Sequence, residues 1–234
     1  MAKKILLGLV MAAFVVGGAF AQNPITFGVG TFFTSDFGGG FEHSITDDAD
    51  LTTTTIIRSP NSGFGGLVFV DALFASMSVG FFTTSGAWER TLSVDDGTDV
   101  LEERWDGNTN LTGLKISLMG KLPIAISESV TIFPMIGFSY RAVLAASTLW
   151  IELDDDREEV DREHQLHANP GDFSALWFRF GLGMDFNVSE RTFLRGTFTY
   201  GMRFRNDFER HAIGDGASGR IGHGVDVMLG LGFR

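Results

Sequence analysis

The chain lacks several features on which large functional classes depend. It has no cysteine, which excludes disulfides, thiolate catalysis and cysteine-based zinc sites. Only 18 Lys and Arg residues stand against 29 Asp and Glu, and this acidic balance argues against a nucleic-acid partner, which needs a basic face. Beyond the N-terminus there is no apolar run close to the ~20 residues of a membrane helix.

Glycine and phenylalanine are abundant instead. The chain contains 30 Gly and 23 Phe, and only 20% of its residues are charged. Without long apolar runs, these large apolar residues must be interleaved with small and polar ones. Such a composition is typical of a β protein whose strands have two different faces.

The N-terminus has the pattern of a secretory signal peptide. Lys3 and Lys4 form a short positive region, residues 5–16 are apolar, and Ala19-Phe20-Ala21 fits the small-x-small cleavage rule. We therefore predict a cleaved signal peptide at 1–21 and one mature domain at 22–234. An exported chain without a second helical span is either a soluble periplasmic or secreted protein, or an outer-membrane β-barrel.

The mature chain contains eight segments in which large apolar residues alternate with small or polar ones, the pattern of half-buried β-strands. These predicted strands lie at 25–33, 66–70, 75–81, 114–122, 130–142, 176–186, 194–204 and 225–233. Short connections are expected at 71–72, 123–129 and 187–191, and long acidic ones at 42–61, 93–108, 149–172 and 206–220. Alternation of short and long connections predicts an up-and-down meander with all short turns at one end, as in outer-membrane barrels.

The two faces of these strands decide between a soluble and a membrane protein. A soluble sandwich or lipocalin-like barrel would cover its polar face with long solvating side chains, but here that face is mostly Gly, Ser and Thr, as expected in the narrow interior of an eight-stranded barrel. We expect the following charged residues to face the lumen: Lys115, Lys121, Arg141, Arg179, Asp185, Arg195, Arg203 and Asp226. We expect the following apolar residues to face lipid: Leu118, Ile136, Phe138, Phe178, Phe180, Leu182, Phe198 and Leu229.

Several strand segments also resemble a known family. They are Leu122-Pro123, residues 132–140, residues 175–185, Phe193-Leu194-Arg195 and residues 200–203. In these segments the chain resembles the small eight-stranded outer-membrane β-barrel proteins, the class of OmpW and of the OmpA transmembrane domain, and more closely the small spirochaetal outer-membrane barrels. The resemblance implies an all-β antiparallel transmembrane barrel in the cell outer membrane, in contact with outer-membrane lipid and with the assembly machinery. Members often end in an aromatic residue read by that machinery, whereas here Phe233 is penultimate and Arg234 is last.

No pattern of catalysis or cofactor binding is identifiable, so we predict a protein that is not an enzyme and has no cofactor. His164 and His167 lie three residues apart in an acidic segment, and 152–156 is an acidic run without EF-hand spacing. Both fit a hydrated loop better than a metal site, and we predict no metal. A lipid-modifying enzyme with His43, Ser44 or His211 at one rim is kept as a minor alternative.

Two other functions remain open. The resemblance favours a narrow porin-like channel for small or partly hydrophobic solutes. The alternative is a closed scaffold whose acidic outward loops bind an extracellular ligand, as an adhesin or an envelope-structural protein. The inward charges discriminate between the two, because a fully paired set would block the lumen whereas a continuous wet path would conduct.

Overall fold

The computed structural model describes residues 25–37, 41–47, 50–58, 61–72, 74–95, 100–153, 159–165, 169–204 and 222–234. The predicted signal peptide lies outside these residues, so it stays a prediction. Among them the helical structure is a single 3-10 turn, η1 (Pro170–Phe173). No helix in the described ranges has the length and apolar character needed to cross a membrane.

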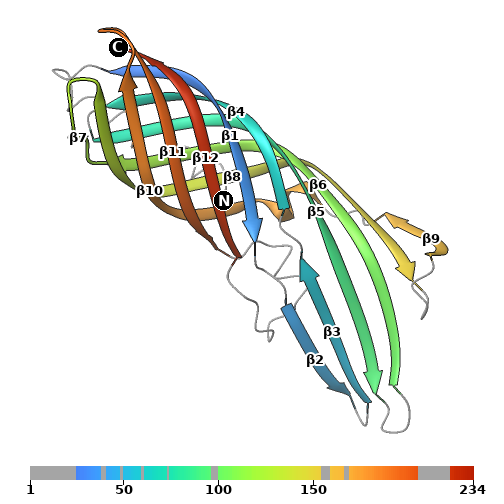
Figure 1. Ribbon diagram of the computed structural model, residues 1–234. Helices are drawn as coiled ribbons and strands as arrows, with labels where there is room; N and C mark the ends of the chain where they lie inside the picture. The colour runs from blue at the N-terminus through green and yellow to red at the C-terminus, as the bar shows by residue number, and fades with distance from the viewer. Residues whose placement is uncertain are drawn as a thin grey trace.

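Eight strands pair antiparallel in chain order and close on themselves. The first strand, β1, pairs with β4 on one side and with the last strand, β12, on the other, and a β5–β6 pairing completes the circle (Figure 1). Each of the eight predicted segments lies on one of these strands, and three of them extend one residue past its end, so the predicted up-and-down barrel is confirmed. The barrel strands are β1 (Thr26–Phe37), β4 (Asn61–Ala72), β5 (Ala75–Asp95), β6 (Val100–Lys121), β8 (Val130–Leu153), β10 (Ala175–Asn187), β11 (Thr192–Arg203) and β12 (Gly222–Phe233).

Three of the barrel strands are much longer than the others. Five have 12 or 13 residues, close to the ~9–11 that cross a bilayer, whereas β5, β6 and β8 have 21, 22 and 24. Their outward halves continue past the barrel and are joined by β2 (Phe41–Asp47), β3 (Asp50–Arg58) and β9 (Glu159–Gln165). The result is an open antiparallel sheet in the order β2-β3-β5-β6-β8-β9, which we call the outer sheet (Figure 1).

The outer sheet corrects the expectation of long loops. Most of the described residues in the predicted loops at 42–61, 93–108 and 149–172 are β-strand, while the predicted loop at 206–220 lies outside the described residues. The turn predicted at 71–72 is also displaced, because Asp71 and Ala72 pair with Ser76 and Ala75 and the chain reverses after Ala72. The other two short connections, at 123–129 and 187–191, are turns as predicted, the first containing the two-residue strand β7 (Ile124–Ala125).

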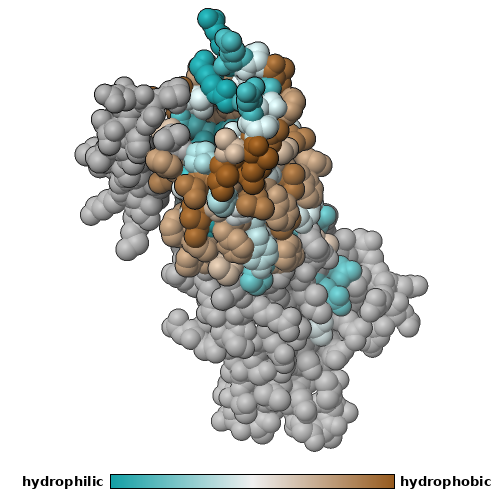
Figure 2. Space-filling view, turned by 60° about the vertical axis from the view of Figure 1, so that its left-hand side comes forward, coloured by the Kyte–Doolittle hydropathy of each residue, from teal (hydrophilic) through white to brown (hydrophobic). Residues whose placement is uncertain are grey.

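The barrel is apolar outside and polar inside. Large apolar side chains such as Leu182, Phe198 and Leu229 are more than half exposed on the outer wall. On the face seen in Figure 2, hydrophobic residues cover much of the described barrel wall, and hydrophilic residues gather at the end that carries the short turns. Among the buried residues are Lys115, Arg141, Arg179, Arg195 and several Asp. A water-soluble protein has the opposite distribution.

Glycines inside the barrel make room for aromatic rings. A Cβ added at Gly183 would lie 2.1 Å from the Phe133 ring, and one at Gly232 would lie 2.1 Å from the Phe193 ring. These inward phenylalanines therefore lie directly against the backbone of the neighbouring strand, opposite a glycine. This arrangement fills a lumen that is only wide enough for side chains.

Candidate functional site: the charged interior of the barrel

Strand alternation directs the predicted lumen charges into the interior. Arg179 is 1% exposed, and five others are also buried, namely Lys115, Arg141, Asp185, Arg195 and Asp226. Lys121 and Arg203 are half-buried as whole residues, although the Lys121 side chain is only 8% exposed. Trp177, which lies on the polar face of its strand, is 1% exposed.

The charges nearer the outward end form one group, the outer charge cluster, consisting of Asp36, Lys115, Arg141, Arg179 and Asp226. Asp226 on β12 is its centre. Arg179 Nη1 lies 2.7 Å from Asp226 Oδ2, Arg141 Nη2 lies 3.2 Å from Asp226 Oδ1, and Lys115 Nζ donates to Oδ2. Three strands, β6, β8 and β10, thus each direct a cation at one carboxylate.

Further hydrogen bonds orient this cluster. Thr34 Oγ1 donates to Asp226 Oδ1 at 2.6 Å and accepts from Arg141 Nη2. Arg141 also donates through Nη1 to Asp36, and Arg179 Nε donates to Ser139 Oγ at 2.7 Å. Charge-assisted bonds of this kind are the strong ones in a dry interior, so the cluster ties β1, β6, β8, β10 and β12 together.

The charges nearer the turns form a second group, the inner charge cluster, consisting of Asp71, Lys121, Asp185 and Arg195. Asp185 and Arg195 are directly opposite each other on β10 and β11, and the guanidinium contacts both carboxylate oxygens, at 2.7 and 2.6 Å. Arg195 Nη1 also donates to Asp71, and Lys121 Nζ lies 2.6 Å from Asp71 Oδ2. Two cations thus face two carboxylates.

Aromatic rings cover the cations of both clusters. The Arg195 guanidinium lies 4.7–5.1 Å from the ring centroids of Phe69, Phe133 and Phe193. Trp177 lies under Arg141 and Arg179 at 4.8 and 4.9 Å. Such contacts stabilise a desolvated cation, and the rings occupy the space that an open pore would need.

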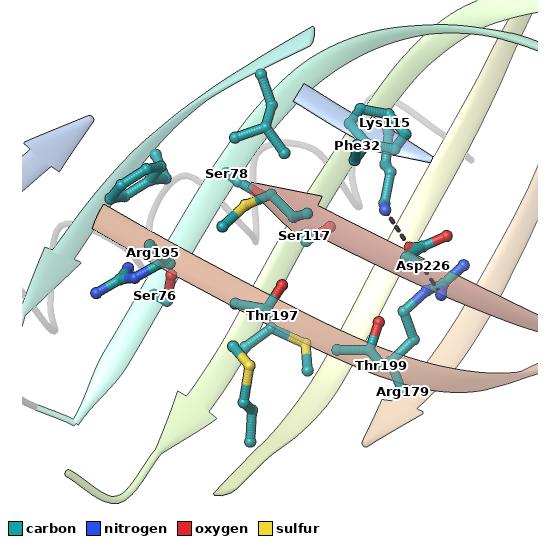
Figure 3. Close-up of a pocket in the computed structure, with 15 residues that line it drawn as sticks. Phe32, Ser76, Ser78, Lys115, Ser117, Arg179, Arg195, Thr197, Thr199 and Asp226 are labelled. Carbon is teal, nitrogen blue, oxygen red and sulfur yellow. Dashed lines mark hydrogen bonds and ion pairs between the residues drawn. The ribbon is translucent and has the colours of Figure 1, made fainter. Parts of the chain in front are cut away.

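A small cavity lies between the two clusters. Its volume is about 60 Å³, enough for a few water-sized species. Lys115, Arg179 and Asp226 line its outward side and Arg195 its opposite side, with the hydroxyls of Ser78, Ser117, Thr197 and Thr199 between them (Figure 3).

Two acidic members of these clusters were not among the predicted residues. Asp36 follows the predicted end of the first strand at residue 33, and Asp71 was assigned to a turn. A signal existed for both, because continuing the alternation of Phe32 and Thr34 by two residues reaches Asp36. Asp71 likewise follows inward Phe69 by two.

The predicted lipid-facing residues lie on the outer wall. Ile136, Phe138, Phe180, Leu182, Phe198 and Leu229 are between 43% and 65% exposed, and Leu118 and Phe178 are partly exposed. Near the outward end of this wall, Tyr200 stacks on His223 at 5.7 Å, and Phe37 lies 6.3 Å from Tyr200. Tyr200 Oη and His223 Nδ1 are 2.7 Å apart. Amphipathic rings of this kind favour the membrane–water boundary.

The remaining candidate residues are only partly placed. His43 and Ser44 lie in β2 and His164 lies in β9, while His167 and His211 fall outside the described residues. Within the described ranges, no group of three or more His, Asp and Glu is arranged to hold a metal.

The arrangement of charge and apolar surface decides where this barrel resides. Its closed sheet leaves no unpaired edge in the wall, its charges are buried, and a continuous apolar band faces outward, which is the reverse of a soluble fold and is what a bilayer requires. The protein is a small outer-membrane β-barrel.

Comparisons with known proteins give only remote similarity. No protein-family model matches the chain, and no curated protein sequence matches it. Ail, the attachment invasion locus protein of Yersinia pestis, solved with the heparin analogue sucrose octasulfate, is 12% identical, with 89% of this chain and 97% of that chain covered and a TM-score of 0.36. OprG from Pseudomonas aeruginosa is 12% identical over 90% and 96%, with a TM-score of 0.38. The outer membrane protease OmpT from Escherichia coli is 6% identical over 91% and 96%, with a TM-score of 0.39.

One prediction is corrected by these comparisons. The sequence predicted that the protein is not an enzyme, because it carries no recognisable catalytic motif. The similar structures include a protease, OmpT, so the exclusion of enzymes is withdrawn. The absence of a linear motif is weak evidence in a barrel, where a site assembled from several strands leaves no local pattern.

Proposed function

We propose that the protein is a closed barrel that anchors the outer sheet outside the membrane, and that this sheet binds a partner there. The single observation that carries the proposal is the length of β5, β6 and β8. Roughly ten residues of each extend beyond the shorter strands, and at ~3.3 Å per residue the sheet reaches about 30 Å past the barrel. Passage of a solute through the lumen does not by itself require an outward structure of this size.

The filled interior supports a closed barrel. Five inward phenylalanines and Trp177 are almost completely buried within it, and most of the inward charges are paired across the lumen. The cavity of about 60 Å³ is far below the ~300–1,000 Å³ of typical small-molecule sites. The porin-like channel favoured by the sequence stays a prediction, and this packing supports the scaffold alternative more strongly.

The sequence of the outward segments indicates the chemistry of the partner. Most of the 29 acidic residues lie in 42–61, 93–108, 149–172 and 206–220. A strongly acidic surface favours association with a basic surface and speeds the encounter at low salt. We therefore propose a cationic extracellular or envelope protein as the ligand.

The proposal is tested by combining conductance with binding. The full mature protein is refolded into planar bilayers and into vesicles, with poly-lysine as the cationic probe. The matched control replaces residues 88–107 by Asn-Gly, which joins β5 and β6 where Ala87 pairs with Asn108. We expect silent bilayers, salt-sensitive capture of poly-lysine by the full protein, and at least tenfold weaker capture by the shortened one.

Two results would contradict the proposal. Discrete current steps from the full protein would show an open lumen and restore the channel. Heat-modifiable gel mobility must first show that the shortened protein is folded. If it then captures poly-lysine as well as the full protein does, the outer sheet is not the binding surface.

A further inference from the structure

The two clusters differ in their balance of charge. The inner charge cluster has two cations and two carboxylates. In the outer charge cluster, Lys115, Arg141 and Arg179 face only Asp36 and Asp226. Among the described residues these two are the carboxylates that pair with the three cations, so one buried positive charge has no carboxylate of its own within the described ranges.

This excess lies in a place where water cannot screen it. Lys115, Arg141 and Arg179 are each at most 7% exposed, inside a barrel surrounded by lipid. An unbalanced charge in such an interior is strongly unfavourable. A bound counterion would remove this penalty.

The cavity between the clusters is suited to a counterion. Lys115 and Arg179 line it, and Arg179 Nη2 is buried without a hydrogen-bond partner among the described residues. Figure 3 shows Ser117 and Thr199 at the same cavity, near the contact of Lys115 and Arg179 with Asp226. Hydroxyl hydrogens rotate freely and donate to an anion. Asp226 also lines the cavity, but its carboxylate already accepts from three cations and Thr34.

From this geometry we propose that the cavity is a binding site for one small inorganic anion of the chloride or bromide class. The anion lies beside Lys115 and Arg179, accepts from the nearby hydroxyls and neutralises the outer charge cluster. A volume of about 60 Å³ admits such an ion together with a water molecule. The inference concerns the lumen alone and does not depend on what the outer sheet binds.

The test compares anions at constant ionic strength. Urea unfolding of the refolded mature protein in detergent is followed by tryptophan fluorescence, with bromide replacing gluconate, which is too large for the cavity. Binding to the folded state alone divides the unfolding equilibrium constant by one plus the ratio of the bromide concentration to its dissociation constant, about tenfold when that ratio is about ten. The stabilisation therefore grows with the logarithm of the bromide concentration, and a stabilisation that is linear in bromide concentration would overturn the proposal.

Three variants locate the effect. Ser117→Asp adds a carboxylate to the cavity wall and should abolish the bromide effect, whereas Ser127→Asp adds the same charge in an exposed turn and should leave it unchanged. If Ser117→Asp does not fold, Arg179→Gln provides the second test, because it removes the excess cation and should also abolish the effect. Equal bromide dependence in the cavity variants and the turn variant would refute the site.

Crystals grown in bromide provide a direct view. An anomalous peak within hydrogen-bonding distance of Lys115 Nζ or the Arg179 guanidinium, together with the logarithmic stabilisation in solution, supports the proposal. A cavity holding water alone refutes it. A peak without any stabilisation in solution means binding at crystal concentration only and refutes it as well.

Discussion

The inner and outer charge clusters solve the same problem, buried charge in a narrow lumen, in different ways. In the inner cluster, Asp185 and Arg195 are direct cross-strand neighbours and Asp71 joins Arg195 to Lys121. In the outer cluster, a single carboxylate on β12 receives cations from three other strands. The inner cluster therefore divides its two cations between two carboxylates, whereas the outer one depends on Asp226. This difference predicts which substitutions the barrel tolerates.

The largest effect is expected for Asp226→Asn. It leaves three buried cations facing Asp36 alone, and breaking a buried ion pair from one side costs about 3–5 kcal/mol. The measurement is urea unfolding of the refolded protein in detergent. Asp185→Asn is the matched comparison, because Arg195 keeps Asp71 and should lose only about 1.5–3 kcal/mol. Equal losses would abolish the distinction between the clusters.

Phe180→Arg tests whether an arginine at this depth in the bilayer is tolerated only when, like Arg179, it has ion-pair partners. Residue 180 is adjacent to Arg179 but is 43% exposed on the lipid side. An arginine facing lipid near the bilayer centre costs about 2–4 kcal/mol, so insertion into vesicles should fall sharply, with Phe180→Leu as control. Folded yield and heat-modifiable gel mobility report the result, and normal insertion would mean that the strand register is wrong.

Arg179→Leu should have an intermediate effect. Asp226 and Ser139 lose a donor, which costs about 1.5–3 kcal/mol, but Lys115 and Arg141 then balance Asp36 and Asp226. The same unfolding assay should place it below Asp226→Asn, with Arg191→Leu in an exposed turn as control. Unchanged stability and gel mobility would argue that Arg179 does not contribute to the interior network.

The smallest effect is expected for Thr34→Val. Its hydroxyl donates to Asp226 and accepts from Arg141, but the three cations remain. A loss of about 0.5–1.5 kcal/mol in the unfolding assay would agree with Thr34 orienting the carboxylate. A loss as large as that of Asp226→Asn would make the hydroxyl, rather than the charges, the centre of the cluster.

The sequence predicts the barrel well because a membrane enforces alternation. Wherever one face meets lipid and the other a tight lumen, apolar and small residues must alternate, and segments such as 176–186 show this clearly. The prediction of strands fails outside the bilayer, where lipid no longer imposes this alternation. In the outer sheet both faces lie beyond the bilayer, so β3, with its run of four threonines at 52–55, has no period of two to mark it as a strand.

The same reasoning explains the missed acids. Asp36 lies at the outward end of β1 and Asp71 near the turn after β4. At these strand ends fewer apolar neighbours remain to mark the strand in the sequence. Their role depends on cations far along the chain, such as Arg141 and Arg195. Pairing between distant residues across a closed lumen leaves no pattern in the local sequence. The alternation of inward and outward side chains within one strand does.

Strands β6 and β8 run continuously from the interior of the barrel into the outer sheet. The strands that carry Lys115 and Arg141 are the same strands whose outward halves form the middle of the outer sheet. A β-bulge between Thr112 and Gly113 marks the place where the barrel gives way to that sheet. Both strands therefore connect the outer charge cluster directly to the outer sheet, so the residues that fix the cluster also fix the base of that sheet.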